Sequence, residues 1–114
     1  MNSLEVSKKA AEILDNKKGI DIKVVYIKDV SILSDYLVIA TGTSSTHVKS
    51  LAEEVEFQLK ELGIVPTHIE GHRSNSWILI DYGNLIVHVF SEDTRKFYDL
   101  ERLWKDGKEI ELNF

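Results

Sequence analysis

Residues 77–90 read WILIDYGNLIVHVF, and this stretch decides the fold. Two runs rich in β-branched and other apolar residues flank Gly83 and Asn84. A Gly-Asn pair between two such runs is typical of a β-hairpin with a two-residue turn. In the register that this turn imposes, Trp77 lies opposite Phe90. Because side chains alternate between the faces of a strand, the predicted hairpin has two distinct faces.

The two faces of this hairpin differ in composition. One is almost purely hydrocarbon and is predicted to be core; it carries Ile78, Ile80, Tyr82, Leu85, Val87 and Val89. The other surrounds a carboxylate and an imidazole with apolar side chains; it carries Trp77, Leu79, Asp81, Ile86, His88 and Phe90. Such a mixture is typical of the centre of a protein interface. A second interpretation stays open, in which the chain's own helices cover this face, with Asp81 in water and His88 hydrogen-bonded inside.

The remaining segments predict a mixed α/β sheet of five strands with flanking helices. Strands are predicted at residues 22–28, 36–40, 66–70, 77–82 and 85–90. One helix is predicted at residues 3–18. A second begins at a cap at residues 43–44 and ends at Gly63, and a third begins at the cap Ser91 and ends at Gly107. The strand at 36–40, the following helix and the strand at 66–70 form a crossover unit whose two strands should run parallel.

The last predicted helix carries an apolar stripe and two ion pairs at helical spacing. The stripe consists of Phe97, Leu100, Leu103 and Trp104, and the pairs are Arg95 with Asp99 and Glu101 with Lys105. We expect one domain over residues 1–107, followed by a tail at 108–114. The alternating end of this tail could lie along the sheet, pair with another chain or stay loose.

Composition limits the class of partner and the compartment. The chain has 114 residues and no cysteine, so neither a disulfide nor a thiolate metal site can form. With 19 acidic and 14 basic residues, its net charge of −5 disfavours DNA and favours a basic protein surface. The N-terminus lacks the apolar core of a signal peptide, and no run is long enough to span a membrane. We therefore expect a cytoplasmic protein.

One segment suggests a different function. The turn from Thr41 to Ser45 reads TGTSS and connects a buried strand to a helix, a position where backbone N–H groups can hold an anion. A phosphate-binding loop would carry more glycines and a following lysine. Thr43 or Ser44 acting as a helix cap also explains the hydroxyl groups. A small nucleotide-binding or nucleotidyltransferase-like enzyme that uses this turn is the alternative function.

Metal and catalytic patterns are weak in this sequence. His68 and His72 are four residues apart, but that spacing aligns ligands on a helix and carries little weight where Gly71 interrupts a strand. Asp81 is a lone carboxylate on its hairpin, which is a poor catalyst and a good anchor for an incoming lysine or arginine. We expect no metal, no cofactor and no enzyme activity.

Three stretches in a fixed order resemble the ribosomal silencing factor family, also called Iojap-like proteins. They are DYLVIATGTSSTHV at residues 35–48, EG at 70–71 followed by WILIDYGNLIVHVF at 77–90, and RKFYDLERLW at 95–104. Two positions depart from the family pattern. Asn84 replaces an aspartate that is common in the turn, and Ser91-Glu92-Asp93 replaces the more usual His-Pro-Glu; both sequences suit their positions.

The resemblance implies a nucleotidyltransferase-like fold without the catalytic acids, and a protein that is not an enzyme. Family members bind the large ribosomal subunit through its ribosomal protein fourteen, and block joining with the small subunit when nutrients are scarce. On that basis, Trp77 and Leu79 would be apolar anchors helped by Phe90, while Asp81 and Glu70 would receive cations. Further contacts are expected from the outer side of the last helix: Tyr98, Asp99 and Glu101. Independently of the resemblance, a third interpretation stays open, in which the protein is a generic adaptor that forms a homodimer through the same face.

Overall fold

A computed structural model describes residues 1–71 and 75–113, and their strands form one mixed sheet. The strands are β1 (Ile20–Tyr26), β2 (Tyr36–Gly42), β3 (His68–Glu70), β4 (Trp77–Asp81), β5 (Leu85–Ser91) and β6 (Lys108–Ile110). Their order across the sheet is β3-β4-β5-β2-β1-β6. The α/β class is confirmed, and the sheet has six strands where five were predicted.

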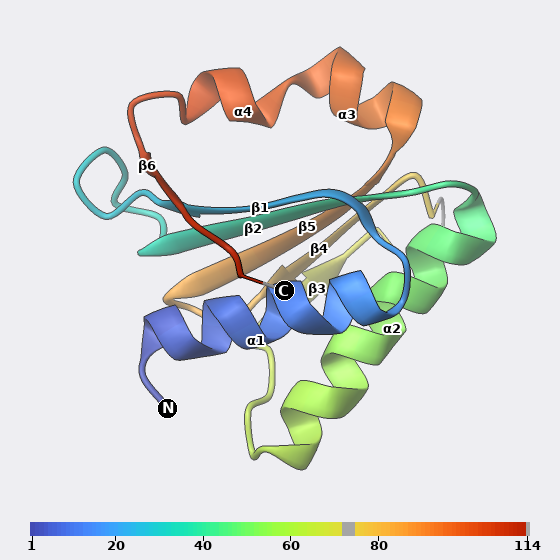
Figure 1. Cartoon of the computed structure of the whole chain (residues 1–114), viewed down its shortest axis with the longest axis horizontal. Coiled ribbons are helices and arrows are strands. Elements are labelled where there is room, and N and C mark those ends of the chain that lie inside the picture. Colours follow the sequence, from blue (N-terminus) through green and yellow to red (C-terminus); the bar gives the residue numbers. More distant parts are fainter. Residues whose placement is uncertain (72–74, 114) are drawn as a thin grey trace.

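Helices lie on both sides of this sheet (Figure 1). The helices are α1 (Ser3–Asn16), α2 (Ser45–Glu61), α3 (Glu92–Tyr98) and α4 (Leu100–Leu103). The two longer helices, α1 and α2, pack on one face, and α3 and α4 lie on the other (Figure 1). We call the face that carries α3 and α4 the α3 face.

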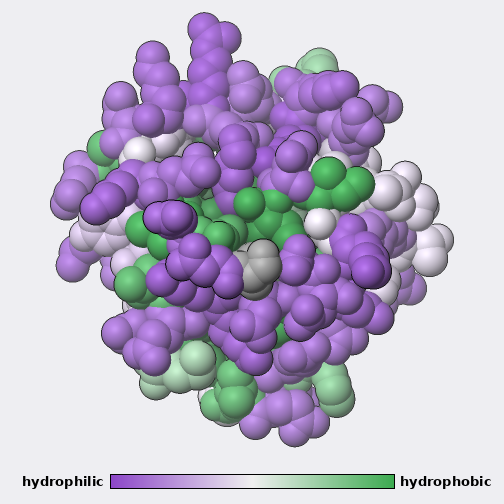
Figure 2. Space-filling view, in the orientation of Figure 1, coloured by the Kyte–Doolittle hydropathy of each residue, from purple (hydrophilic) through white to green (hydrophobic). Residues whose placement is uncertain are grey.

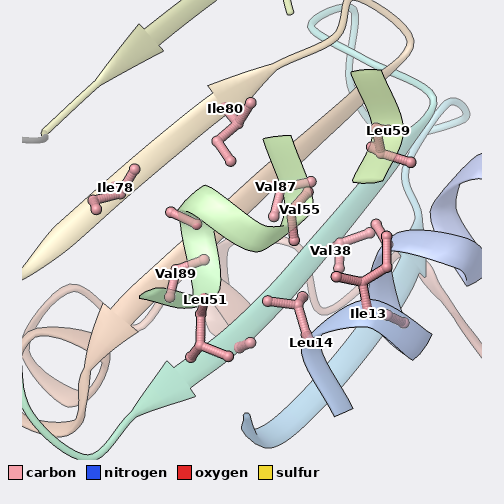
Figure 3. Packing of buried hydrophobic residues seen from close by; sticks show 14 of the residues in the cluster. Ile13, Leu14, Val38, Leu51, Val55, Leu59, Ile78, Ile80, Val87 and Val89 are labelled. Atoms are coloured by element: carbon pink, nitrogen blue, oxygen red, sulfur yellow. The ribbon is translucent and has the colours of Figure 1, made fainter. Parts of the chain in front are cut away.

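The hairpin forms in the predicted register. Trp77 pairs with Phe90 and Asp81 with Ile86, so the residues between them alternate as expected. The apolar side of the hairpin packs against α1 and α2 in the main core (Figure 3), where Val87 is completely buried. The strands β2 and β3 run in the same direction, because β3 is antiparallel to β4, β4 to β5, and β5 parallel to β2. The predicted crossover is confirmed.

The three longer helices, α1, α2 and α3, are each capped at the N-terminus by a side chain. The Asn2 side chain accepts from the Glu5 N–H and the Glu5 side chain accepts from the Asn2 N–H, a reciprocal capping box. Ser44 and Ser91 accept from backbone N–H groups at the starts of α2 and α3. The predicted cap at Ser91 is confirmed. Of the two candidates Thr43 and Ser44 in the TGTSS turn, Ser44 is the cap.

The C-terminal part of the chain differs from the prediction. A single helix was expected, but Asp99 adopts a left-handed conformation (φ 47°, ψ 55°) that ends α3 and starts α4. Because the helix axis breaks there, Phe97 and Leu103 are 80% and 65% exposed, and only Leu100 and Trp104 of the predicted stripe pack against the sheet. The tail then returns to the sheet, where β6 pairs antiparallel with β1.

The surface seen in the Figure 1 orientation is mostly hydrophilic. Figure 2 shows hydrophobic residues gathered across the middle of this view, at the level of the sheet, between hydrophilic residues above and below. None of the helices within the described residues is long and apolar enough to cross a membrane.

Candidate functional site

The helices α3 and α4 cover one part of the α3 face and leave another part accessible. The covered part is a second, smaller core made of Val25, Ile27, Leu37, Ile39 and Phe90, with Trp77, Leu100 and Trp104 packed against it. The accessible part comes from β3, β4 and the start of β5. We call it the open sheet face and define it by five side chains that are half-buried or exposed: Glu70, Trp77, Leu79, Asp81 and Ile86.

The second interpretation, in which the chain's own helices cover this face, holds for one half of it. At one end, Phe90 is 0% exposed, so the expectation that it offers apolar surface to a partner is corrected. The buried Phe90 ring packs against the Trp77 ring instead, and the two ring centroids are 5.0 Å apart. The physical reason is that α3 begins directly after β5 and folds back over its last residues (Figure 1).

Trp77 lies at the boundary between the covered and the open part. Its ring is half-buried between Phe90 and Tyr98, whose ring centroid is 4.7 Å away. Tyr98, at the end of α3, is exposed and extends the aromatic surface beyond the sheet. Large amphipathic rings in such positions are the side chains that most often dominate binding energy at interfaces.

His88 is buried under this boundary, as the second interpretation expected. It is 6% exposed, and its Nδ1 accepts a hydrogen bond from the Trp77 indole N–H at 3.0 Å. Burial lowers the pKa of His88 to about 4, because the charged imidazolium is poorly solvated there. The ring is therefore neutral at pH 7.

Two carboxylates flank the apolar floor of the open sheet face. Glu70 lies opposite Leu79 in the β3–β4 register, and Asp81 lies opposite His68. Asp81 Oδ1 accepts from the Gly83 N–H at 2.7 Å, while the Glu70 carboxylate lies 3.0 Å from His68 Nε2. The hairpin and the edge strand thus bring together Glu70, Leu79 and Asp81, as the sequence predicted. The same register adds Ile86, which the sequence placed on this face but not among the candidate contacts. It also adds His68, which pairing β3 with β4 would have selected.

The other two candidate residues, Asp99 and Glu101, lie away from the open sheet face. Both line a pocket of about 390 Å³ beside Thr41 and Gly42 at the carboxyl end of β2. Asp99 is exposed at the helix break. Among the described residues, Glu101 pairs with Arg95 and Lys23, and these pairs stand in place of the predicted i,i+4 pairs.

A charged network centred on Glu101 ties α3, α4, β1 and β2 together. The Glu101 carboxylate accepts from Arg95 Nε at 2.8 Å and from Lys23 Nζ at 2.6 Å. Arg95 Nη1 donates to Thr41 Oγ1 at 2.8 Å, and the Arg95 side chain is only 10% exposed. The hydrogen bonds from Arg95 and Lys23 lower the pKa of Glu101 to about 2, from an ordinary value of 4.5. This network is structural, since it holds the broken helix against the sheet.

We expect the Glu101→Gln variant to lower the free energy of unfolding by about 2 kcal/mol at pH 7, because Arg95 would stay buried without its anion. The difference from the parent should shrink as the pH falls from about 4.5 towards 2, where the parent carboxylate becomes protonated. Urea denaturation at several pH values measures this. The control is Glu92→Gln, which breaks an exposed i,i+4 pair with Lys96 and should change stability by less than about 0.5 kcal/mol. Equal losses in both variants would contradict a structural network.

Hydrogen bonds within the protein link the TGTSS turn to the first turn of α2. The N–H of Thr43 donates to His47 Nδ1 at 2.9 Å, and the N–H of His47 donates to Ser44 Oγ at 3.1 Å. A Cβ on Gly42 would lie 2.8 Å from the Val48 backbone nitrogen, so glycine is needed for the close approach of β2 and α2. The composition of the turn is thus explained by capping and packing.

Of the two histidines considered as metal ligands, His68 and His72, His72 lies outside the described residues. Within residues 1–71 and 75–113, no group of three or more histidine, aspartate or glutamate side chains is arranged to hold a metal ion.

Comparison with known proteins identifies the family. The family model described as "Ribosomal silencing factor during starvation" matches residues 1–114. The chain belongs to the ribosomal silencing factor family. It is 37% identical over 114 residues to the ribosomal silencing factor of Bacillus subtilis, covering 100% of this chain and 97% of that one. A crystal structure of a Chromobacterium violaceum protein superposes with a TM-score of 0.90 at 38% identity, covering 100% of this chain and 94% of that one.

One relative is a mouse protein. The protein named "Mitochondrial assembly of ribosomal large subunit protein 1" is 30% identical over 95 residues, which cover 81% of this chain and 42% of the mouse protein. As a ribosomal silencing factor, the chain is a ribosome-associated regulator of translation and not an enzyme. The alternative of a nucleotidyltransferase-like enzyme is therefore rejected, and the resemblance stated from the sequence is confirmed.

Proposed function

We propose that the open sheet face binds the large ribosomal subunit through its ribosomal protein fourteen. The observation that carries the proposal is the composition of this face, where Trp77, Leu79 and Ile86 lie beside the carboxylates of Glu70 and Asp81. Apolar anchors flanked by charges suit a partner with a basic surface, and the net charge of −5 favours such a partner as well. The mouse relative's name supports an association with the large subunit.

The mechanism that we propose is steric exclusion. A domain measuring 33 × 33 × 28 Å, bound on the surface where the two subunits meet, prevents the small subunit from joining. Translation is thereby repressed when nutrients are limiting, and no covalent bond is made or broken. Release of the factor restores the joining surface, so repression is reversible. We place this activity in the cytoplasm, where the subunits join.

The direct experiment mixes the purified protein with separated ribosomal subunits. Co-sedimentation with the large subunit alone, together with fewer assembled ribosomes, is the expected result. Sedimentation with the small subunit, or normal assembly in the presence of bound factor, would contradict the proposal. A homodimer through the open sheet face would compete with this binding, so the protein's mass in solution should be measured at the same concentrations.

We expect the Asp81→Lys variant to bind the large subunit about tenfold more weakly, because a cation would face the basic partner. The hydrogen bond from the Gly83 N–H is lost, so stability should fall by no more than about 1 kcal/mol. The matched control is Asp15→Lys, which makes the same charge change at an exposed position of α1, on the other side of the sheet. Equal co-sedimentation of both variants and the parent would remove Asp81 from the interface.

A further inference from the structure

A buried histidine contacts the aromatic anchor of the open sheet face. His88 lies on β5, opposite Leu79 and diagonal to Trp77. The Trp77 indole Nε1–H donates to His88 Nδ1 at 3.0 Å, and the two ring centroids are 5.9 Å apart. The His88 ring also stacks on Phe90, at 5.8 Å and with only 7° between the ring planes. The Trp77 ring therefore contacts two rings that lie parallel to each other.

The chemistry of this contact restricts the state of the imidazole. Because Nδ1 accepts a hydrogen bond, the proton of the neutral ring is carried by Nε2. The lowered pKa of His88, caused by burial, keeps the ring neutral well below pH 7 and keeps this acceptor available. An indole has one polar atom, so a single acceptor fixes which way the ring lies in its plane. Phe90 below and Tyr98 beside the ring limit rotation out of that plane.

We propose that His88 is a positioning residue that fixes the orientation of Trp77 for docking. The proposal rests on the proposed function, since it assumes that Trp77 contacts the ribosomal partner. His88 itself is buried and contributes through the indole alone. An anchor that is already ordered before binding loses less side-chain entropy on association. Loss of this ordering should weaken binding about three- to tenfold.

The test compares two substitutions of His88, one with a hydrogen-bond acceptor and one without. In His88→Asn the side-chain oxygen can take the place of Nδ1 as acceptor, whereas His88→Leu fills similar space without an acceptor. The chain has two tryptophans, so an ¹⁵N–¹H spectrum shows two indole signals, and a Trp104→Phe variant assigns them. We expect His88→Leu to shift the Trp77 indole signal upfield and speed its hydrogen exchange. It should also bind the large subunit three- to tenfold more weakly, and His88→Asn should largely restore both properties.

Each result supports or overturns the inference. If His88→Leu leaves the indole signal or large-subunit binding unchanged, or if His88→Asn binds as weakly as His88→Leu, His88 does not position the anchor. Urea denaturation of both variants shows whether any binding loss follows a loss of fold; a loss that tracks stability alone also overturns the inference. The variant Trp77→Ala distinguishes a failure of the His88 inference from a failure of the proposed function. If Trp77→Ala binds like the parent, Trp77 is not an anchor and both proposals fail; if it alone weakens binding, only the role of His88 fails.

Discussion

Replacing Gly71 with alanine is expected to lower the free energy of unfolding by about 3 kcal/mol or more. Gly71 has a φ of +95°, where other residues are strained, and it connects β3 to the segment that leads into β4. A Cβ at this position would lie 1.9 Å from the carbonyl oxygen of Trp77, which is backbone and cannot rotate away. The strands must separate to accept it. Urea denaturation measures the loss of stability, and weaker large-subunit binding should accompany it, because Glu70 and Trp77 flank the disturbed contact.

The matched control for this prediction is Gly63→Ala. Gly63 has a similar φ of +80°, but an added Cβ would meet nothing within 4 Å. This variant should therefore lose only the cost of a left-handed alanine, about 1 kcal/mol. It lies after α2, away from the open sheet face. Similar losses for the two variants would show that the conformation of Gly71, and not the close approach to Trp77, determines the effect.

Replacing Trp77 with alanine is expected to weaken binding to the large subunit at least 30-fold, which corresponds to about 2 kcal/mol. The indole is the largest side chain of the open sheet face and is already ordered by Phe90, Tyr98 and His88. Its removal takes away the aromatic anchor and leaves a depression beside Leu79. Equilibrium binding of labelled protein to purified large subunits measures the effect.

The control for this variant is Phe57→Ala. Phe57 is also a large exposed aromatic residue, at 60% exposure, but it lies on α2 at the opposite side of the sheet. Its truncation should leave large-subunit binding within about twofold of the parent. Both variants should remain folded, as denaturation would show. If Phe57→Ala and Trp77→Ala weaken binding equally, the open sheet face is not the docking surface.

Most of the fold could be predicted because its main features are local. The Gly83-Asn84 turn fixes the register of β4 and β5, and Ser44 and Ser91 cap the helices that follow them. Alternation along the hairpin then identified the core side, which packs against α1 and α2 (Figure 3). The break at Asp99 could not be predicted in the same way, since no glycine marks it and the apolar spacing continues through it.

The candidate site could be predicted only in part. Spacing placed Trp77, Leu79, Asp81 and Phe90 on one face, and the structure agrees. Which of them stay accessible depends on where α3 and α4 lie, and that is not a property of the hairpin. Glu101 shows the reason, because its partner Lys23 is 78 residues away in the sequence.

The sequence by itself determined the hairpin, its two faces, the helix caps and the membership of the ribosomal silencing factor family. The hairpin, its faces and the caps depend on turn chemistry and alternation, which act within a few residues. Family membership follows from the order of three motifs along residues 35–104. Only the tertiary structure decided that Phe90 is buried, that β6 joins the sheet, and that part of the α3 face stays open. These features depend on long-range contacts, since the position of a helix over a sheet is set by packing and by ion pairs between distant segments, which a local pattern does not encode.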